Sequence, residues 1–225
     1  MTDEITDPFI MAYDEMMKDN PNEELAFSLF ERAHESGDPR ATYAIATWYL
    51  FGGYVKKNIN RAVLLLKESA RKKIPDAMYD LAVCFEDGTG VKRGKKKAFD
   101  LYLKAALRND HQSVEEVARC YWFGIGVNRD RRVARIWYER AKELGVGEVN
   151  DRLENISQID KDAKEKAFES NLKAALRNEH KAFEEVARCY FSGIGVKSNR
   201  RVARIWYERA KELNIGEKIP SMIVQ

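Results

Sequence analysis

Apolar residues recur along the chain at offsets of three, four and seven positions, a spacing that places side chains on one face of an α-helix. A longer period lies over this pattern, because a glycine-containing turn returns after 36, 36 and 69 residues. These turns begin at Gly52, Gly88, Gly124 and Gly193. The last spacing is close to two repeats. Each unit is therefore predicted to contain a helix, a glycine turn and a second helix.

The positions around each turn glycine hold the same residue types in all four units. An aromatic residue lies three positions before the glycine and an alanine six before it, while a valine lies three after it and a second alanine ten after it. In chain order these are Tyr49, Phe85, Tyr121 and Tyr190; Ala46, Ala82, Ala118 and Ala187; Val55, Val91, Val127 and Val196; Ala62, Ala98, Ala134 and Ala203. Recurrent alanine is what close packing between helices requires.

Residues that stop or start helices lie where the period predicts the boundaries. Second helices are expected to begin at Asn58, Asp130 and Asn199, whose side chains can accept a hydrogen bond from a free N–H group, with Gly94 at that place in the second unit. Residues that tolerate the left-handed conformation stand where helices are expected to end. These are Asn109, Gly145, Asn178 and Asn214.

The repeats predict an all-α chain, a single α/α solenoid of about six antiparallel helix pairs. A degenerate pair is expected in residues 1–39, with helices near 8–18 and 22–36, and a degenerate repeat in 149–181, with a connection near 158–161. Full repeats are expected at 40–75, 76–112, 113–148 and 182–217, followed by a tail, 218–225. Residues 97–148 and 166–217 are identical at 38 of 52 positions. This indicates duplication of a block in an array whose units contact mainly their neighbours.

The segments SVEEVARCYWFGIGVNRDRRVARIWYERA and AFEEVARCYFSGIGVKSNRRVARIWYERA resemble the sel-one-like repeat (SLR), a relative of the tetratricopeptide repeat. AMYDLAVCFEDGTGVKRGKKKAFDLYLKAA and, more loosely, ATYAIATWYLFGGYVKKNINRAVLLLKESA share the pattern, although Tyr54 replaces the second glycine of the last. The resemblance implies a right-handed superhelix that acts as a protein–protein adaptor, with first helices lining a concave face. The cysteine pairs seven residues apart of some family members are missing here.

Composition and charge narrow the class of protein. The chain is 44% hydrophobic and 33% charged, and it has neither a signal-like start nor an apolar run long enough to cross a membrane, so we expect a cytoplasmic protein. Three separated cysteines fit reduced thiols. Residues 1–39 carry 2 basic and 11 acidic side chains, whereas residues 40–148 carry 22 and 13. We expect the acidic segment to cap one end of the array.

Several features could carry chemistry, and each has a structural interpretation. The Gly-Ile-Gly-Val segments could cradle phosphate, but a helix precedes them and no third glycine follows, which favours a turn. Cys84, Cys120 and Cys189 occupy one slot of the repeat and are expected to be packing residues. His111 and His180 are repeat equivalents at turns, and His34 is isolated. We therefore predict no catalytic, metal or cofactor-binding residues and no small-molecule substrate.

The basic stretches VKRGKKK (91–97), RDRRVAR (129–135) and NRRVAR (199–204) leave a nucleic-acid-binding protein open as an alternative. Exposed aromatic residues for base stacking do not alternate with them, because Trp137 and Trp206 occupy core positions of the repeat. We expect these stretches to form a solvated convex face. A hydrolase is the second alternative, and it would need a convergent set of acid, base or nucleophile.

The predicted binding surface lies on the first helices, at positions that the repeat does not fix. Arginines beside aromatic residues there favour a protein-binding site, whereas Glu115 with Arg119 and Glu184 with Arg188 could also be simple stabilising pairs. The predicted partner-binding residues are Tyr43, Thr47, Tyr79, Glu115, Arg119, Trp122, Glu184, Arg188 and Phe191. We predict a non-enzymatic adaptor, regulator or immunity-type inhibitor that holds a protein or peptide on its concave face. Phe123 and Ser192, where the copies differ, are candidates for partner choice.

Overall fold

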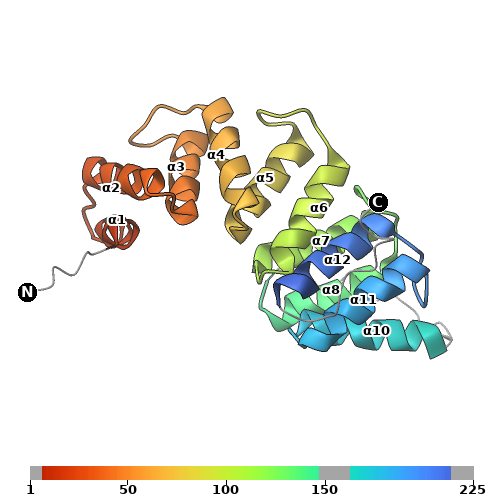
Figure 1. Cartoon of the computed structure of the whole chain (residues 1–225). Coiled ribbons are helices and arrows are strands. Elements are labelled where there is room, and N and C mark those ends of the chain that lie inside the picture. Colours follow the sequence, from red (N-terminus) through yellow and green to blue (C-terminus); the bar gives the residue numbers. More distant parts are fainter. Residues whose placement is uncertain (1–6, 147–162, 214–225) are drawn as a thin grey trace, which may run out of the picture. The chain divides into compact units, whose positions relative to one another are not determined.

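The computed structural model of the chain describes residues 7–146 and 163–213, and every regular element within those ranges is an α-helix (Figure 1). The chain divides into two compact units, Met1–Gly94 and Lys95–Gln225. The sequence prediction of an all-helical repeat fold is thereby confirmed. The two units are described in turn.

The first unit contains five helices that pack in chain order. They are α1 (Pro8–Met16), α2 (Glu23–Glu35), α3 (Pro39–Phe51), α4 (Ile59–Arg71) and α5 (Pro75–Asp87). Each helix lies against the one that follows it. The helix pair expected in residues 1–39 is therefore present as α1 and α2.

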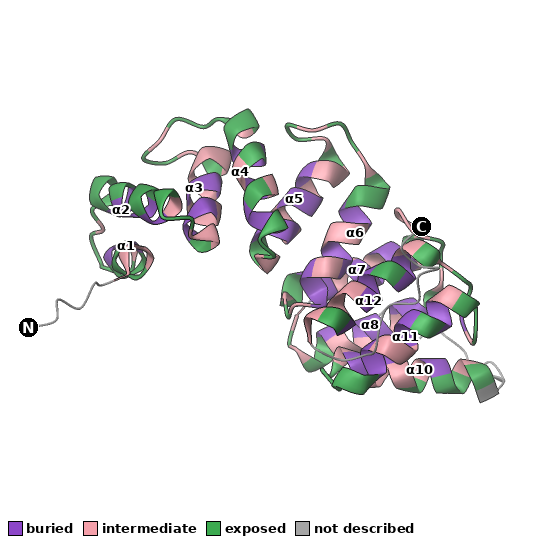
Figure 2. Ribbon diagram, viewed as in Figure 1, coloured by how far each residue is buried: buried purple, intermediate pink, exposed green. Residues whose placement is uncertain are grey.

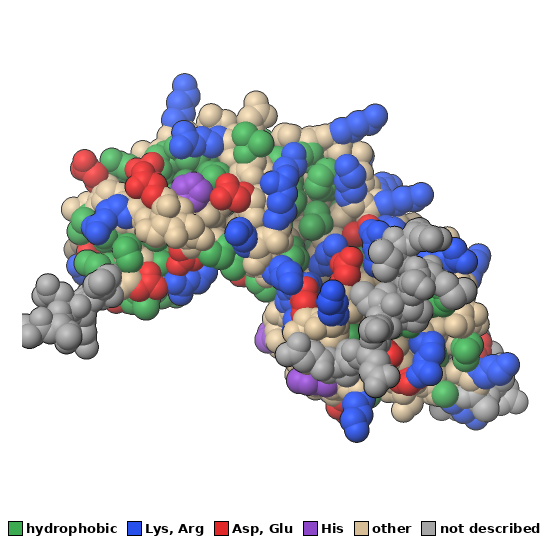
Figure 3. Space-filling model, viewed as in Figure 1, with side chains coloured by type: hydrophobic (Ala, Val, Ile, Leu, Met, Phe, Trp, Pro, Cys, Tyr) green, Lys and Arg blue, Asp and Glu red, His purple; other side chains and the backbone are tan. Residues whose placement is uncertain are grey.

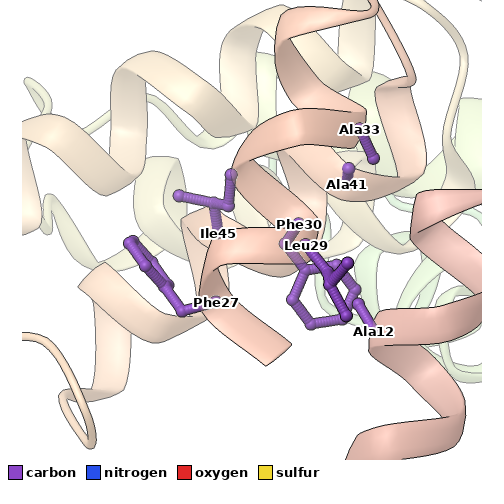
Figure 4. Packing of buried hydrophobic residues seen from close by; sticks show 7 residues of the cluster. All are labelled: Ala12, Phe27, Leu29, Phe30, Ala33, Ala41 and Ile45. Atoms are coloured by element: carbon purple, nitrogen blue, oxygen red, sulfur yellow. The ribbon is translucent and has the colours of Figure 1, made fainter. Parts of the chain in front are cut away.

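Small and aromatic side chains share the core of the first unit (Figure 4). The buried cluster consists of Ala12, Phe27, Leu29, Phe30, Ala33, Ala41 and Ile45. The ring of Phe27 stacks on Trp48 with centroids 5.2 Å apart. Ala41 and Ala46 are fully buried in α3, so the helices pack closely enough to leave no exposed alanine at these positions.

The predicted helix starts are confirmed by their side-chain caps. Asn58 accepts from the N–H of Arg61, Asp130 accepts from those of Arg132 and Val133, and Asn199 accepts from that of Val202. Each cap compensates backbone donors that have no partner inside the helix.

Left-handed residues follow the second helices, as predicted. Positive φ angles occur at Asn109, Gly145 and Asn178, and also at Gly37 and Lys73 in the equivalent slots of earlier repeats. The sequence pattern did not single out Lys73, because lysine rarely adopts this conformation. Asn214 lies outside the described residues.

The second unit contains two blocks of three helices each. The first block is α6 (Lys95–Ala106), α7 (His111–Phe123) and α8 (Arg131–Glu143). The second block is α10 (Ala163–Leu176), α11 (His180–Ser192) and α12 (Arg200–Glu212). In each block the middle helix packs on both others, and buried residues line the inside of the unit (Figure 2).

The two blocks face each other about a local two-fold axis. Residues that are 69 positions apart, and hence equivalent in the duplication, contact each other directly. The hydroxyl oxygens of Tyr121 and Tyr190 lie 3.0 Å apart, and Asn178 donates to Asn109 over 3.0 Å. The rings of Trp137 and Trp206 have centroids 6.2 Å apart. A residue meets its own counterpart in this way only across a two-fold axis.

Reciprocal ion pairs confirm this relation. Lys104 pairs with Glu208 at 3.3 Å, and their counterparts Lys173 and Glu139 pair at 2.8 Å. Arg108 pairs with Glu212 at 2.5 Å, and their counterparts Arg177 and Glu143 pair at 2.6 Å. Helix α12 therefore lies beside α6, and α10 lies beside α8.

The blocks add a contact between helices that are far apart in the sequence. The units contact mainly their neighbours, as expected, but α12 also contacts α6, which precedes it by about a hundred residues. The physical reason is that the two blocks are nearly identical and present complementary charges to each other. The first part of the repeat expected at 149–181, its connection near 158–161 and the tail at 218–225 lie outside the described residues. The right-handed superhelix and the single concave face stay predictions.

Candidate functional site

The first two amides of the glycine turns donate within the turn. The N–H groups of Gly88 and Thr89 both donate to the carbonyl of Cys84, and those of Gly193 and Ile194 both donate to the carbonyl of Cys189. The N–H of the residue that begins the next helix donates to the carbonyl of the aromatic residue before the turn, as Asp130 does to Tyr121 over 2.9 Å. These donors are not available to a phosphate group, so the interpretation as a turn is confirmed.

The second glycine of the turn allows a close approach between helices. A Cβ atom on Gly126 would lie 2.1 Å from the carbonyl oxygen of Lys95, and one on Gly195 would lie 2.2 Å from that of Lys164. The glycine turn that follows α7 therefore packs on the N-terminal end of α6, and the one that follows α11 packs on the N-terminal end of α10. The spacing of the two glycines, which recurs in three units, serves packing rather than ligand binding.

The three thiols are packing residues, as predicted. Cys84, Cys120 and Cys189 are all free and buried. Burial, with Asp80 and Asp87 nearby, raises the pKa of Cys84 to about 11, and burial also raises the pKa of Cys189. Thiols with raised pKa values stay protonated at neutral pH and are poor nucleophiles.

The three histidines lie near helix ends. Nδ1 of His34 lies 2.9 Å from Oγ1 of Thr42, while His111 and His180 are exposed at the first positions of α7 and α11. Within residues 7–146 and 163–213, no group of three or more histidine, cysteine or acidic residues could hold a metal ion.

The expectation of a solvated face for the basic stretches is wrong for three arginines. Arg132 pairs with Glu165, and Arg135 lies 3.7 Å from Glu169. Arg201 pairs with Asp100 at 2.6 Å and donates to two backbone carbonyls. Their side chains are only about a quarter exposed because they cross between the two blocks.

The predicted binding residues of the first unit lie on neighbouring helices. Tyr43 in α3 donates its hydroxyl to Asp80 in α5 over 3.1 Å, and Tyr79 precedes that aspartate. Thr47 donates to the carbonyl of Ala44, so its hydroxyl is used within its own helix. All three predicted residues are partly exposed. The structure thus brings Tyr43 and the helix of Tyr79 together.

In the second unit, Glu115, Arg119 and Trp122 are partly exposed on α7. The carboxylate that pairs with Arg119 belongs to Glu116, at 2.6 Å, rather than to the Glu115 that the spacing of four had suggested. The guanidinium of Arg131 lies over the ring of Trp122, 5.0 Å from its centroid. The sequence pattern did not indicate that Arg131 takes part.

The counterparts on α11 repeat this arrangement. Arg188 pairs with Glu185, and the guanidinium of Arg200 lies 5.6 Å from the ring centroid of Phe191. Glu184 is partly exposed on the same helix. The two sets therefore form equivalent surfaces, one in each block. The identical spacing from aromatic ring to arginine in both copies is the signal that could have revealed Arg131 and Arg200.

The repeat helices with their glycine turns match the family model for the Sel1 repeat, over residues 19–38, 39–73, 75–110, 113–146 and 185–215. The chain belongs to the Sel1 repeat family. Two solved structures resemble this Sel1 repeat protein, each with a TM-score of 0.62 and each covering 92% of the chain. One is a protective antigen present in uropathogenic Escherichia coli strains, described as displaying an SLR fold, at 24% identity. The other is a Sel1 repeat protein from Oxalobacter formigenes, at 22% identity.

The likeness to these two structures concerns the fold alone. The chain spans 45% of the length of the antigen and 83% of the Oxalobacter protein. A search of curated proteins finds no sequence that matches this chain. Among the described helices, none combines the length and the apolar character needed to cross a bilayer.

Proposed function

We propose that this chain is a non-enzymatic scaffold that holds a partner protein or peptide on the first helices of its repeats. Sel1 repeat proteins are generally protein-interaction scaffolds. The proposal goes further and assigns partner contacts to the nine predicted residues, among which Trp122 and Phe191 are expected to contribute most.

The observation that carries the proposal is an aromatic ring beneath an arginine at equivalent places in both blocks. The equivalent position in the first unit holds Leu50 in α3 and Glu86 in α5. The helix pair therefore does not require a ring at this position. A partly exposed ring under a guanidinium offers both apolar area and a cation, which are the features of interface residues that contribute most to binding.

The finer part of the proposal is a role as an adaptor, a regulator or an immunity-type inhibitor in the cytoplasm. The three buried thiols suit a reducing compartment. Arg132, Arg135 and Arg201 already pair with acidic residues, which disfavours the nucleic-acid alternative. A gel shift at low ionic strength tests that alternative directly, since phosphate binding strengthens as salt is lowered.

The experiment is a comparative pull-down with quantitative mass spectrometry from the source organism. The baits are the wild-type chain and the double variants R119A/W122A and R188A/F191A, with Leu64→Ala as the matched control, because Leu64 is 66% exposed on a second helix. We expect a partner whose recovery falls about tenfold or more with the double variants and is unchanged with Leu64→Ala. Equal recovery with all baits of unchanged helicity would remove these faces from the proposal.

A further inference from the structure

The outer face of α1 carries an apolar stripe that is largely exposed among the described residues, although the ring of Tyr13 stacks on Phe9 of the same helix. Ile10, Tyr13 and Met17 are 47%, 51% and 64% exposed, although side chains of this size are mostly buried in proteins. Their offsets of three and seven positions place them on one side of the helix. Met11 extends the stripe and is 42% exposed.

The opposite face of α1 anchors the helix to the rest of the first unit. Ala12 is fully buried in the core cluster, and the partly buried Phe9 and Met16 pack against that cluster. Arg40, at the start of α3, lies over the ring of Phe9 at 4.2 Å from its centroid. The stripe is therefore additional to the residues that hold α1 in place.

Among the described helices, α1 has a single main neighbour. Helix α3 lies between α2 and α4, whereas α1 packs mainly on α2. Here half of the strongly exposed large apolar side chains in the described ranges lie within residues 10–25. The acidic segment therefore also carries an apolar stripe.

The surroundings of the stripe are acidic. Asp14 is exposed beside Tyr13 and Met17, and exposed Asp19, Glu23 and Glu24 follow at the end of α1 and the start of α2. Figure 3 shows acidic and hydrophobic side chains close together over α1 and α2, with a smaller number of basic side chains among them. Lys18 is the sole basic residue in the sequence from 7 to 31, and it pairs with Glu15 at 2.5 Å. The last turn of α1 also lacks a basic residue to offset the negative end of the helix dipole.

We propose that this stripe docks an amphipathic helix of a partner protein whose polar side is basic. Apolar residues spaced by three and four on a partner helix match a stripe of the same spacing. Met11 and Met17 have flexible side chains that can adapt to the partner. The acidic rim attracts a basic helix, and it opposes a second copy of this chain in the same place, because two acidic rims would then face each other. This surface is separate from the α7 and α11 faces of the proposed function.

The test uses the full chain and two synthetic peptides about 18 residues long, roughly five helical turns. One peptide carries leucine on one face and lysine on the other, and the second has glutamate in place of every lysine. Fluorescence anisotropy measures both affinities. We expect the leucine–lysine peptide to bind at least about tenfold more tightly than the leucine–glutamate peptide. Added salt should weaken the binding of the leucine–lysine peptide. Since the whole chain has a net charge of +3, non-specific attraction would favour the opposite order.

Variants of the chain test whether the leucine–lysine peptide binds at the stripe. I10S/Y13S/M17S should lose about tenfold or more in affinity for the leucine–lysine peptide, and D14N/D19N should lose a smaller factor. Leu64→Ser changes an equally exposed apolar residue elsewhere in the first unit and should leave the affinity unchanged. The proposal is overturned if the stripe variant, with helicity like that of the wild type, binds as tightly as the wild type. It is also overturned if sedimentation shows a dimer of the chain that the stripe variant abolishes.

Discussion

The hydroxyl oxygens of Tyr121 and Tyr190 lie 3.0 Å apart in the interior of the second unit, and each residue is the counterpart of the other in the duplicated sequence. Both side chains are buried, at 3% and 2% exposure. The pair therefore marks the local two-fold axis between the blocks. Substitutions at the two positions should act on one shared hydrogen bond.

Removing one hydroxyl should cost more than removing both. In Tyr121→Phe the hydroxyl of Tyr190 loses its partner inside the protein, and we expect the free energy of unfolding to fall by about 1–2 kcal/mol. In Y121F/Y190F no buried hydroxyl is left without a partner, so stability should return most of the way to that of the wild type. Urea denaturation of the four proteins gives the coupling energy. Additive losses in the double variant would contradict a shared bond.

The same pair predicts a loss of stability at high pH. Burial raises the pKa values of Tyr121 and Tyr190 above the ordinary value of about 10. The unfolded chain therefore loses these protons near pH 10 while the folded chain retains them. Stability due to this pair is complete below pH 10 and falls as the pH rises further. Unfolding measured between pH 8 and about 11 should show a shallower decline for Y121F/Y190F than for the wild type.

Two equivalent ion pairs provide a comparison within one molecule. Arg108 and Glu212 have side-chain exposures of 10% and 18%, whereas their counterparts Arg177 and Glu143 have 55% and 38%. Arg108→Ala removes the closer of two arginines that pair with the largely buried Glu212, which keeps Arg209 at 3.3 Å, and we expect a loss of about 2 kcal/mol. Arg177→Ala should cost clearly less, since water screens exposed pairs. Thermal unfolding of both variants measures the two losses of stability. Equal losses would contradict the role assigned to burial of the ion pair.

A glycine at Lys73 should stabilise the first unit. Lys73 has a φ angle of 71°, in the slot where other repeats have Gly37, Asn109 or Gly145. A left-handed conformation costs a side chain with a Cβ atom about 1 kcal/mol that glycine does not pay, so Lys73→Gly should raise stability by about that amount. Lys72→Gly is the matched control, because Lys72 has a φ angle of −82°. That change should lower stability or leave it the same.

The sequence predicted the helices and turns inside each repeat. Gly124 and Gly193 marked the turns, and Asn58 and Asp130 marked the helix starts, because these residues satisfy local backbone requirements that every unit shares. The positive φ angle of Lys73 was not predicted, because the packed helices impose at this position the φ angle of the other repeats even though the residue is a lysine.

The contacts between the blocks could not be predicted in the same way. Periodicity describes how one unit follows another, and it contains no information on a rotation that brings Trp137 to Trp206. The identity of the two copies was the available signal, since identical surfaces can pair with each other across a two-fold axis. The partner-binding residues were predicted at first-helix positions that the repeat pattern does not fix. The contacts of Arg131 and Arg200 with aromatic rings became visible only in the structure.

A close approach between neighbouring repeats supplies the last prediction. A Cβ atom on Gly126 would lie 2.1 Å from the carbonyl oxygen of Lys95, whereas one on Gly37 would meet nothing within 4 Å. Both glycines have positive φ angles, so alanine at either site carries the conformational cost of about 1 kcal/mol. Gly126→Ala must also displace the backbone at the start of α6, and we expect a total loss of about 3 kcal/mol or more. Gly195→Ala should behave alike, since its Cβ atom would lie 2.2 Å from the carbonyl oxygen of Lys164. Urea denaturation of the three variants measures the difference, and a loss for Gly126→Ala no larger than that for Gly37→Ala would show that the turn does not need its close contact with α6.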